Sequence, residues 1–140
     1  MIVVIDTNVV SVMFRSSHAC RPILDAWTAG RFAWAITTEI LLEYEEVLSR
    51  LGRPGRARSL LDAVDQVAEA RGNLLRISPS FRFHLIADDA DDDKFADCAI
   101  AAGADYILTN DHHFDVLIGS GHKAQPIAPE EFIQRHLAGV

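Results

Sequence analysis

Cysteine, long apolar runs and positive charge are all scarce in this sequence. Its two cysteines, Cys20 and Cys98, are too few for a disulfide framework and lack the paired spacing of a zinc site, so we expect both to be reduced and buried. No stretch approaches the roughly 20 apolar residues that a membrane span needs. The first residues also lack the basic, apolar and small-residue regions of a secretory signal. These absences predict a cytoplasmic protein with no membrane segment.

Lysine and arginine number 13 against 20 aspartates and glutamates, which gives a formal net charge of −7. A protein that holds nucleic acid through a general positive field needs the opposite balance. The negative charge is also uneven, because five aspartates fall within six positions: Asp88, Asp89, Asp91, Asp92 and Asp93. The direction in which they point decides what the acidic character means.

The sequence does contain a regular alternation of strand-length apolar runs with segments of helical periodicity. Its 140 residues, 49% of them apolar, suit one compact domain over residues 1–140. The predicted strands are Ile2–Ile5, Phe32–Ile36, Leu74–Ile77, Tyr106–Leu108 and, more weakly, Gln125–Ala128. This alternation predicts a three-layer α/β/α domain whose central, mostly parallel sheet has four to five strands.

The helix expected after the second strand, from Thr37 or Thr38, carries four glutamates. At roughly 100° per residue, its apolar side chains share one arc. Those side chains are Ile40, Leu41, Tyr44, Val47, Leu48 and Leu51. Two glutamates, Glu39 and Glu46, point away from the arc toward solvent. The other two, Glu43 and Glu45, both flank it, so either can reach over the edge of the sheet.

Carboxylates follow the predicted strands at the edge where a parallel sheet collects ligands. Asp6 comes directly after the first strand, and Asp111 follows the strand 106–108. Asp92 and Asp93 open the helical segment 94–102 that leads to that strand. Each aspartate taken alone is explained as well by helix capping.

Their convergence, however, predicts a bound cation. Carboxylates about 4 Å apart repel each other by about 4 kcal/mol at an effective dielectric constant near 20. Oxygen ligands without a histidine or cysteine framework favour Mg²⁺ or Mn²⁺. The chemistry expected of such a site is metal-assisted attack of water on a phosphodiester.

Three stretches, VVIDTNVV, TTEILLEYEEVLSR and DADDDKFADCAIAAGADYILTND, resemble the successive motifs of PIN-domain proteins, in particular the VapC-like toxin components of toxin–antitoxin systems. The resemblance implies that Asp6, Glu43, Asp92 and Asp111 are the catalytic, metal-binding acids, with Asp93 as a near alternative to Asp92. It favours Glu43 over Glu45, which the helix periodicity left undecided.

What this resemblance implies for function is a Mg²⁺- or Mn²⁺-dependent endoribonuclease that hydrolyses single-stranded RNA. It also implies a small antitoxin protein as partner and a possible homodimer. One departure is that the motif at the fourth acid reads Thr-Asn-Asp, where glycine is more usual in the middle.

Polar residues flank the predicted acids and are expected to hydrogen-bond the carboxylates or their waters. These residues are Thr7, Asn8, Thr109 and Asn110. His112 and His113 lie beside Asp111, but adjacent helical residues point about 100° apart, so they do not both face one ion easily. We expect them at the surface or behind the ligands.

A local basic patch, the four arginines Arg50, Arg53, Arg56 and Arg58, lies around the break at 52–55. Because arginine suits phosphate well, the patch is a candidate contact for RNA or a partner, although a solvated corner between two helices explains it equally well.

Three other functions compete with the nuclease. A haloacid-dehalogenase-like phosphatase needs a second aspartate two positions after Asp6, where Asn8 stands. A response-regulator receiver domain needs an aspartate near position 53, where arginine, proline and glycine stand. A non-catalytic PIN-like module, whose acidic pocket takes a partner's arginine, differs from the enzyme in lacking metal-dependent cleavage.

Overall fold

The computed structural model describes residues 1–86 and 90–138, and of residues 90 and 91 it describes the backbone alone. Two of the five clustered aspartates, Asp88 and Asp89, lie outside the described residues, as does the side chain of Asp91.

Five strands form one sheet in the order β3-β2-β1-β4-β5, and every neighbouring pair is parallel. The strands are β1 (Ile2–Ile5), β2 (Ala33–Ile36), β3 (Leu74–Arg76), β4 (Tyr106–Leu108) and β5 (Gln125–Ile127). The prediction of a parallel α/β sheet is therefore confirmed, with strand ends shifted by one residue at most.

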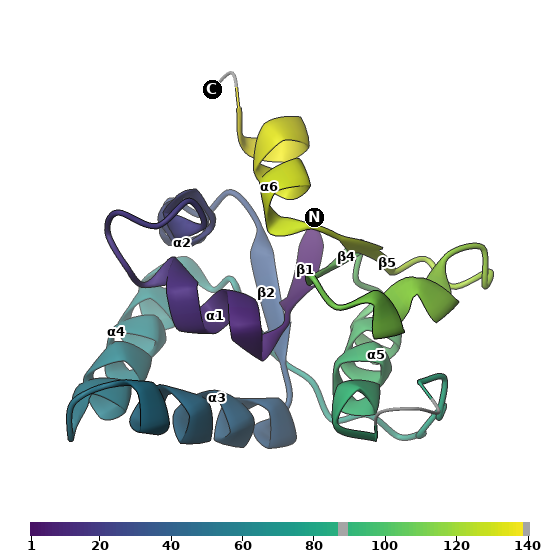
Figure 1. Ribbon diagram of the computed structural model, residues 1–140, viewed down its shortest axis with the longest axis horizontal. Helices are drawn as coiled ribbons and strands as arrows, with labels where there is room; N and C mark the ends of the chain where they lie inside the picture. Colours follow the sequence, from purple (N-terminus) through teal and green to yellow (C-terminus); the bar gives the residue numbers. More distant parts are fainter. Residues whose placement is uncertain (87–89, 139–140) are drawn as a thin grey trace.

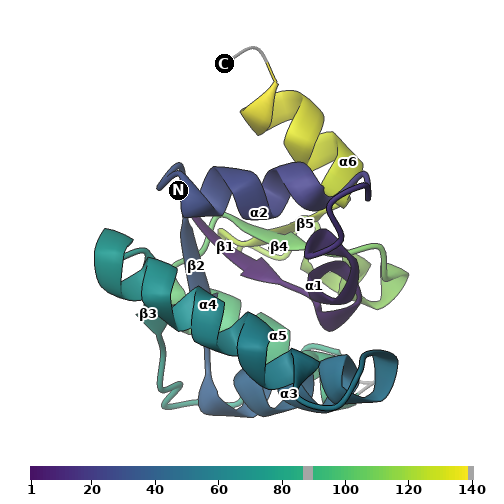
Figure 2. The same ribbon diagram turned by 90° about the vertical axis from the view of Figure 1, so that its left-hand side faces the viewer.

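The helices connect these strands and cover both faces of the sheet. They are α1 (Thr7–Met13), α2 (Arg21–Thr28), α3 (Thr38–Leu51), α4 (Arg56–Arg71), α5 (Ala90–Ala102) and α6 (Pro129–Phe132). A 3₁₀-helix, η1 (His112–Leu117), lies between β4 and β5, and a π-helical turn, η2 (Ile133–Leu137), continues α6. Figure 1 shows α1, α2 and α4 on one side of the sheet and α5 on the other, and Figure 2 shows α4 in front of the sheet with α5 behind it.

The apolar residues of the strands and of the inner helix faces make one continuous core. β1 is its centre, since Val3, Val4 and Ile5 have no exposed surface. Both cysteines are buried and free, as expected, and burial raises the pKa of the Cys98 thiol to about 12. In the described part of the chain, no helix combines the length and the apolar character that crossing a membrane requires.

Helix α3 begins where the sequence predicts, because the Thr37 side chain accepts a hydrogen bond from the Ile40 N–H and caps its first turn. Its buried face holds Ile40, Tyr44 and Leu48, whereas Leu51 is exposed. Leu51 was expected on the apolar arc. It is the last residue of α3, and its side chain is exposed beside the turn at 52–55.

Helix α5 begins at Ala90, earlier than the segment 94–102 expected from the sequence. Asp92 and Asp93 lie within its first turn, at the start of the helix as the sequence indicates. Because successive helical residues point about 100° apart, the two carboxylates face different surroundings.

Candidate active site

The register of β1 with β4 brings two predicted acids to one edge of the sheet. Ile5 pairs with Leu108, so Asp6 and Thr109 leave the sheet side by side. The Thr109 hydroxyl donates to Asp6 Oδ2 at 2.7 Å and accepts from the Asp111 N–H at 2.9 Å. One buried hydroxyl thus holds both carboxylate-bearing segments in place.

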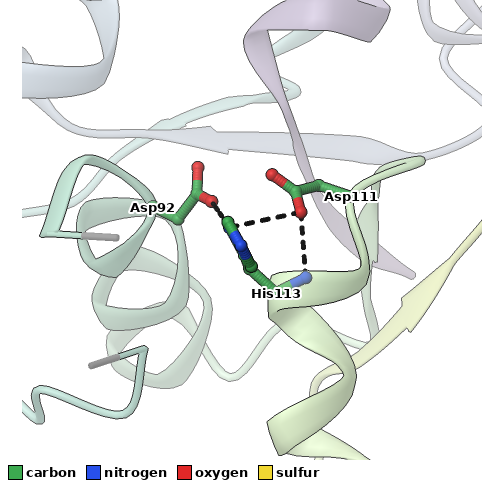
Figure 3. Close-up of side chains that lie close together, drawn as sticks. All are labelled: Asp92, Asp111 and His113. Atoms are coloured by element: carbon green, nitrogen blue, oxygen red, sulfur yellow. Dashed lines mark hydrogen bonds and ion pairs between the residues drawn. The ribbon is translucent and has the colours of Figure 1, made fainter. Parts of the chain in front are cut away.

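The closest group of possible ligands contains Asp92, Asp111 and His113, whose ligand atoms all lie within 4.8 Å of one another. Figure 3 shows the His113 ring between Asp92, from α5, and Asp111, from the loop after β4. Its Nδ1 lies 3.4 Å from an oxygen of each carboxylate. The His113 backbone N–H also donates to Asp111 Oδ1 at 2.9 Å, which makes Asp111 the cap of η1.

Glu43 reaches the same edge from α3. The Thr7 hydroxyl donates to Glu43 Oε2, while Lys94 Nζ lies 2.7 Å from Oε1. The Lys94 side chain is only 9% exposed. Glu45 is exposed, so the structure separates the two glutamates that helix periodicity left equivalent.

Asp93 faces away from this group. Its Oδ1 accepts from the Ile86 N–H at 2.8 Å, and its Oδ2 lies 3.7 Å from His84 Nδ1. Asp92 and not Asp93 is therefore the aspartate of the pair that lies beside Asp111.

Burial and neighbouring charge act differently on the two strand-end acids. Asp6 is 5% exposed, and burial raises its pKa; hydrogen bonds oppose this effect, and repulsion by Asp111 and Glu43 adds to it. The hydrogen bond from the His113 N–H lowers the pKa of Asp111, with the charge of the His113 ring acting in the same direction. The site thus gathers negative charge that the protein compensates in part.

The donor set fits a divalent cation. Carboxylate oxygens outnumber the single imidazole nitrogen, and such a set suits Mg²⁺ or Mn²⁺ better than zinc or copper. Asp92 and Asp111 would hold the ion most directly, with Asp6 and Glu43 at its margin.

The residues expected to support the acids divide into two kinds. Thr7 and Thr109 each donate a hydrogen bond to a predicted acid. Asn8 and Asn110 are exposed, and among the described residues neither side chain forms a hydrogen bond.

The arginine patch lies apart from the acids, at the corner between α3 and α4. All four arginines are exposed, and Arg58 lies 3.8 Å from Asp62. Arg50, Arg53 and Arg56 form no ion pair with any described residue.

Of the two histidines, His112 pairs with Asp115 and is exposed, so only His113 joins the acids.

The comparisons with known proteins agree with this geometry. The model of the PIN domain family matches residues 2–113, most of the chain and all four predicted acids. The chain belongs to the PIN domain family. PIN domains are nucleases as a family, and this PIN domain has the acidic cluster compatible with that chemistry.

A solved structure with a similar fold is VapBC2 from Rickettsia felis bound to a DNA fragment from their promoter. The similarity has a TM-score of 0.62 at 17% sequence identity and covers 91% of this PIN domain and 98% of that chain. At this identity the likeness shows the fold alone. No curated protein sequence matches this PIN domain significantly.

Sequence reasoning missed two participants in the site. The ion pair of Lys94 with Glu43 joins two helices that are distant in sequence, so no local pattern signals it. His113 is exposed, as expected, but its ring also lies between two carboxylates, which the sequence reasoning did not indicate. Its signal was its place in the first turn of a helix capped by a predicted acid.

Proposed function

We propose that this PIN domain is a Mg²⁺- or Mn²⁺-dependent endoribonuclease that hydrolyses single-stranded RNA, and that it is the toxin of a toxin–antitoxin pair. The observation that carries the proposal is the meeting of Asp92, Asp111 and His113 within 4.8 Å, beside Asp6 and Glu43. Four separate parts of the chain contribute these groups, and the mutual repulsion of the carboxylates would oppose folding unless a cation were bound there.

When bound, a divalent ion would supply the Lewis-acid chemistry that lowers the pKa of water and stabilises charge on the leaving oxygen. Asp92 and Asp111 would hold the ion, and Asp6 and Glu43 would orient water beside it. Thr109 keeps Asp6 and Asp111 in register, and Thr7 fixes the Glu43 carboxylate. Thr7 and Thr109 therefore position the acids without touching the reacting atoms.

The antitoxin belongs to the proposal for a separate reason. The similar fold of VapBC2 was solved as a toxin–antitoxin complex with promoter DNA. A chain with a net charge of −7 and a cluster of carboxylates would be inhibited well by a partner that offers a cation to those carboxylates.

The test compares two adjacent aspartates. Purified protein is incubated with total cellular RNA and Mn²⁺ or Mg²⁺, with and without EDTA, alongside Asp92→Asn and Asp93→Asn. We expect cleavage by the wild type, loss with EDTA, and loss of roughly 100-fold or more in Asp92→Asn.

Asp93→Asn is the matched control, because an amide oxygen can still accept from the Ile86 N–H. It should retain most activity. Cleavage that survives Asp92→Asn but fails in Asp93→Asn would show that Asp93 is the ligand. No cleavage by folded wild type with either metal would favour the non-catalytic interaction module.

A further inference from the structure

A cavity of about 280 Å³ opens beside the candidate active site, between the start of α3, the segment 77–82 and α5. Its lining combines hydroxyl, charged and aromatic side chains and includes Thr37, Ser78, Phe81, Arg82, Lys94 and Asp97. The acidic cluster described above does not use this cavity.

The cavity and the active site share a wall. Lys94 lines the cavity, and its ammonium group lies 2.7 Å from Glu43 Oε1. Glu39 also lines the cavity, one helical turn before Glu43 on α3. A strand whose phosphate meets the acids would therefore bring a neighbouring nucleotide to the cavity mouth.

An exposed aromatic ring lies at this mouth. Phe81 is 72% exposed, the largest fraction among the large apolar side chains of the described residues. The neighbouring Arg82 is also exposed, and its Nη2 lies 3.8 Å from Glu39. Aromatic rings and guanidinium planes are the groups on which unpaired bases stack.

The segment that carries Phe81 is fixed through its backbone. Asp97 Oδ1 accepts from the Phe83 N–H at 2.9 Å, and Asp93 Oδ1 accepts from the Ile86 N–H at 2.8 Å. Both aspartates belong to α5, so the helix that supplies Asp92 to the site also positions this segment. These contacts hold the residues that follow Phe81 against α5, and such anchoring lowers the cost of ordering the segment when a ligand binds.

We propose that this cavity receives one unstacked nucleobase of the RNA strand, next to the scissile phosphate, with Phe81 as its stacking platform. Its volume lies just below the roughly 300–1,000 Å³ of small-molecule sites, so it suits a single base and not a folded strand. The inference rests on the proposed function, because that function supplies RNA as the ligand.

The test measures RNA binding separately from cleavage. A fluorescent single-stranded RNA is titrated with the cleavage-deficient Asp92→Asn protein, and with the same protein carrying Phe81→Ala, Phe81→Trp or Phe83→Ala. We expect Phe81→Ala to weaken binding roughly 10-fold to 100-fold and Phe81→Trp to preserve it.

Phe83→Ala is the matched control, since Phe83 lies on the same segment, contacts the His122 ring and does not line the cavity. It should bind as the parent protein does. Equal losses in both alanine variants would indicate a general disturbance of the segment and overturn the proposal.

A second arm uses RNAs with a single abasic site at successive positions. The parent protein should lose affinity for one position above all, and Phe81→Ala should lose that sensitivity. Uniform responses, or no RNA binding by any protein, would overturn the base site. If wild-type protein fails to cleave but the abasic pattern holds, the nuclease proposal fails while the base site stands.

Discussion

An aspartate lies at each end of the sheet, and the surroundings shift the two pKa values in opposite directions. At the amino end, Asp105 accepts from the Ile2 N–H at 2.8 Å and lies 3.2 Å from Lys123 Nζ; the hydrogen bond and the lysine lower its pKa. At the carboxyl end, burial and two neighbouring acids raise the pKa of Asp6. One aspartate stabilises the fold, whereas the other is retained where its charge opposes folding. That difference separates a structural end of the sheet from the end that carries the proposed active site.

We expect the largest effect on activity from a substitution at the carboxyl end of the sheet. Asp6→Asn keeps an acceptor for Thr109 but removes the charge, so RNA cleavage should fall roughly 100-fold or more. In EDTA the same variant should be more stable than the wild type by about 1 kcal/mol, because no charge is buried there and the repulsion with Asp111 and Glu43 is gone. Activity assays and thermal unfolding measure the two effects. A variant that loses both activity and stability would make Asp6 merely structural.

A divalent ion should stabilise the protein through the carboxyl end of the sheet alone. At a concentration 100 times its Kd, Mn²⁺ or Mg²⁺ should stabilise the wild type by about 2.7 kcal/mol. Asp105→Asn should gain as much as the wild type does, and Asp92→Asn should gain little. Unfolding in EDTA and in metal gives these values. Equal gains for all three proteins would place the ion elsewhere.

At the amino end of the sheet, removing the charge of the aspartate should lower the stability of the fold instead of raising it. Because folding lowers the pKa of Asp105, its contribution is present above the unfolded pKa and is lost as the pH falls through the folded value. Asp105→Asn should therefore cost about 1 kcal/mol at neutral pH, discounted for partial exposure, and almost nothing in strong acid. Urea unfolding at several pH values tests this. A constant cost at every pH would point to the loss of shape instead of charge.

The smallest effect concerns the arginines that lie at neither end. Replacing Arg50, Arg53 and Arg56 with glutamine should weaken RNA binding several-fold and flatten its dependence on salt. Arg58→Gln serves as the comparison, since Asp62 already lies near that side chain. Binding titrations at two salt concentrations suffice. An unchanged salt dependence would make the patch an ordinary solvated corner.

The strands could be predicted from sequence because each is a short apolar run, and their parallel order follows from the helices between them. The position of Asp6 and Asp111 at one edge followed from the same argument. The choice of Glu43 over Glu45 did not, because periodicity placed both beside the apolar arc. That choice depended on family resemblance, and the structure adds the contacts with Thr7 and Lys94.

His113 shows why the rest of the site escaped prediction. As expected from the sequence, His112 and His113 point in different directions, since successive residues of the 3₁₀-helix η1 lie about 120° apart, and only His113 meets the acids. Its place between Asp92 and Asp111 also depends on how α5 packs against the loop after β4. Such contacts between distant segments leave no periodic signal in a single sequence.

The backbone anchoring of the segment around Phe81 has a consequence for how substrate preference can evolve. Its two hydrogen bonds to α5 come from the N–H groups of Phe83 and Ile86, which almost every residue type supplies. Side chains there can therefore be exchanged while the anchoring persists. If the cavity takes a base as proposed, relatives can diverge in the RNA they select by drift in this short segment, with the proposed catalytic acids left untouched.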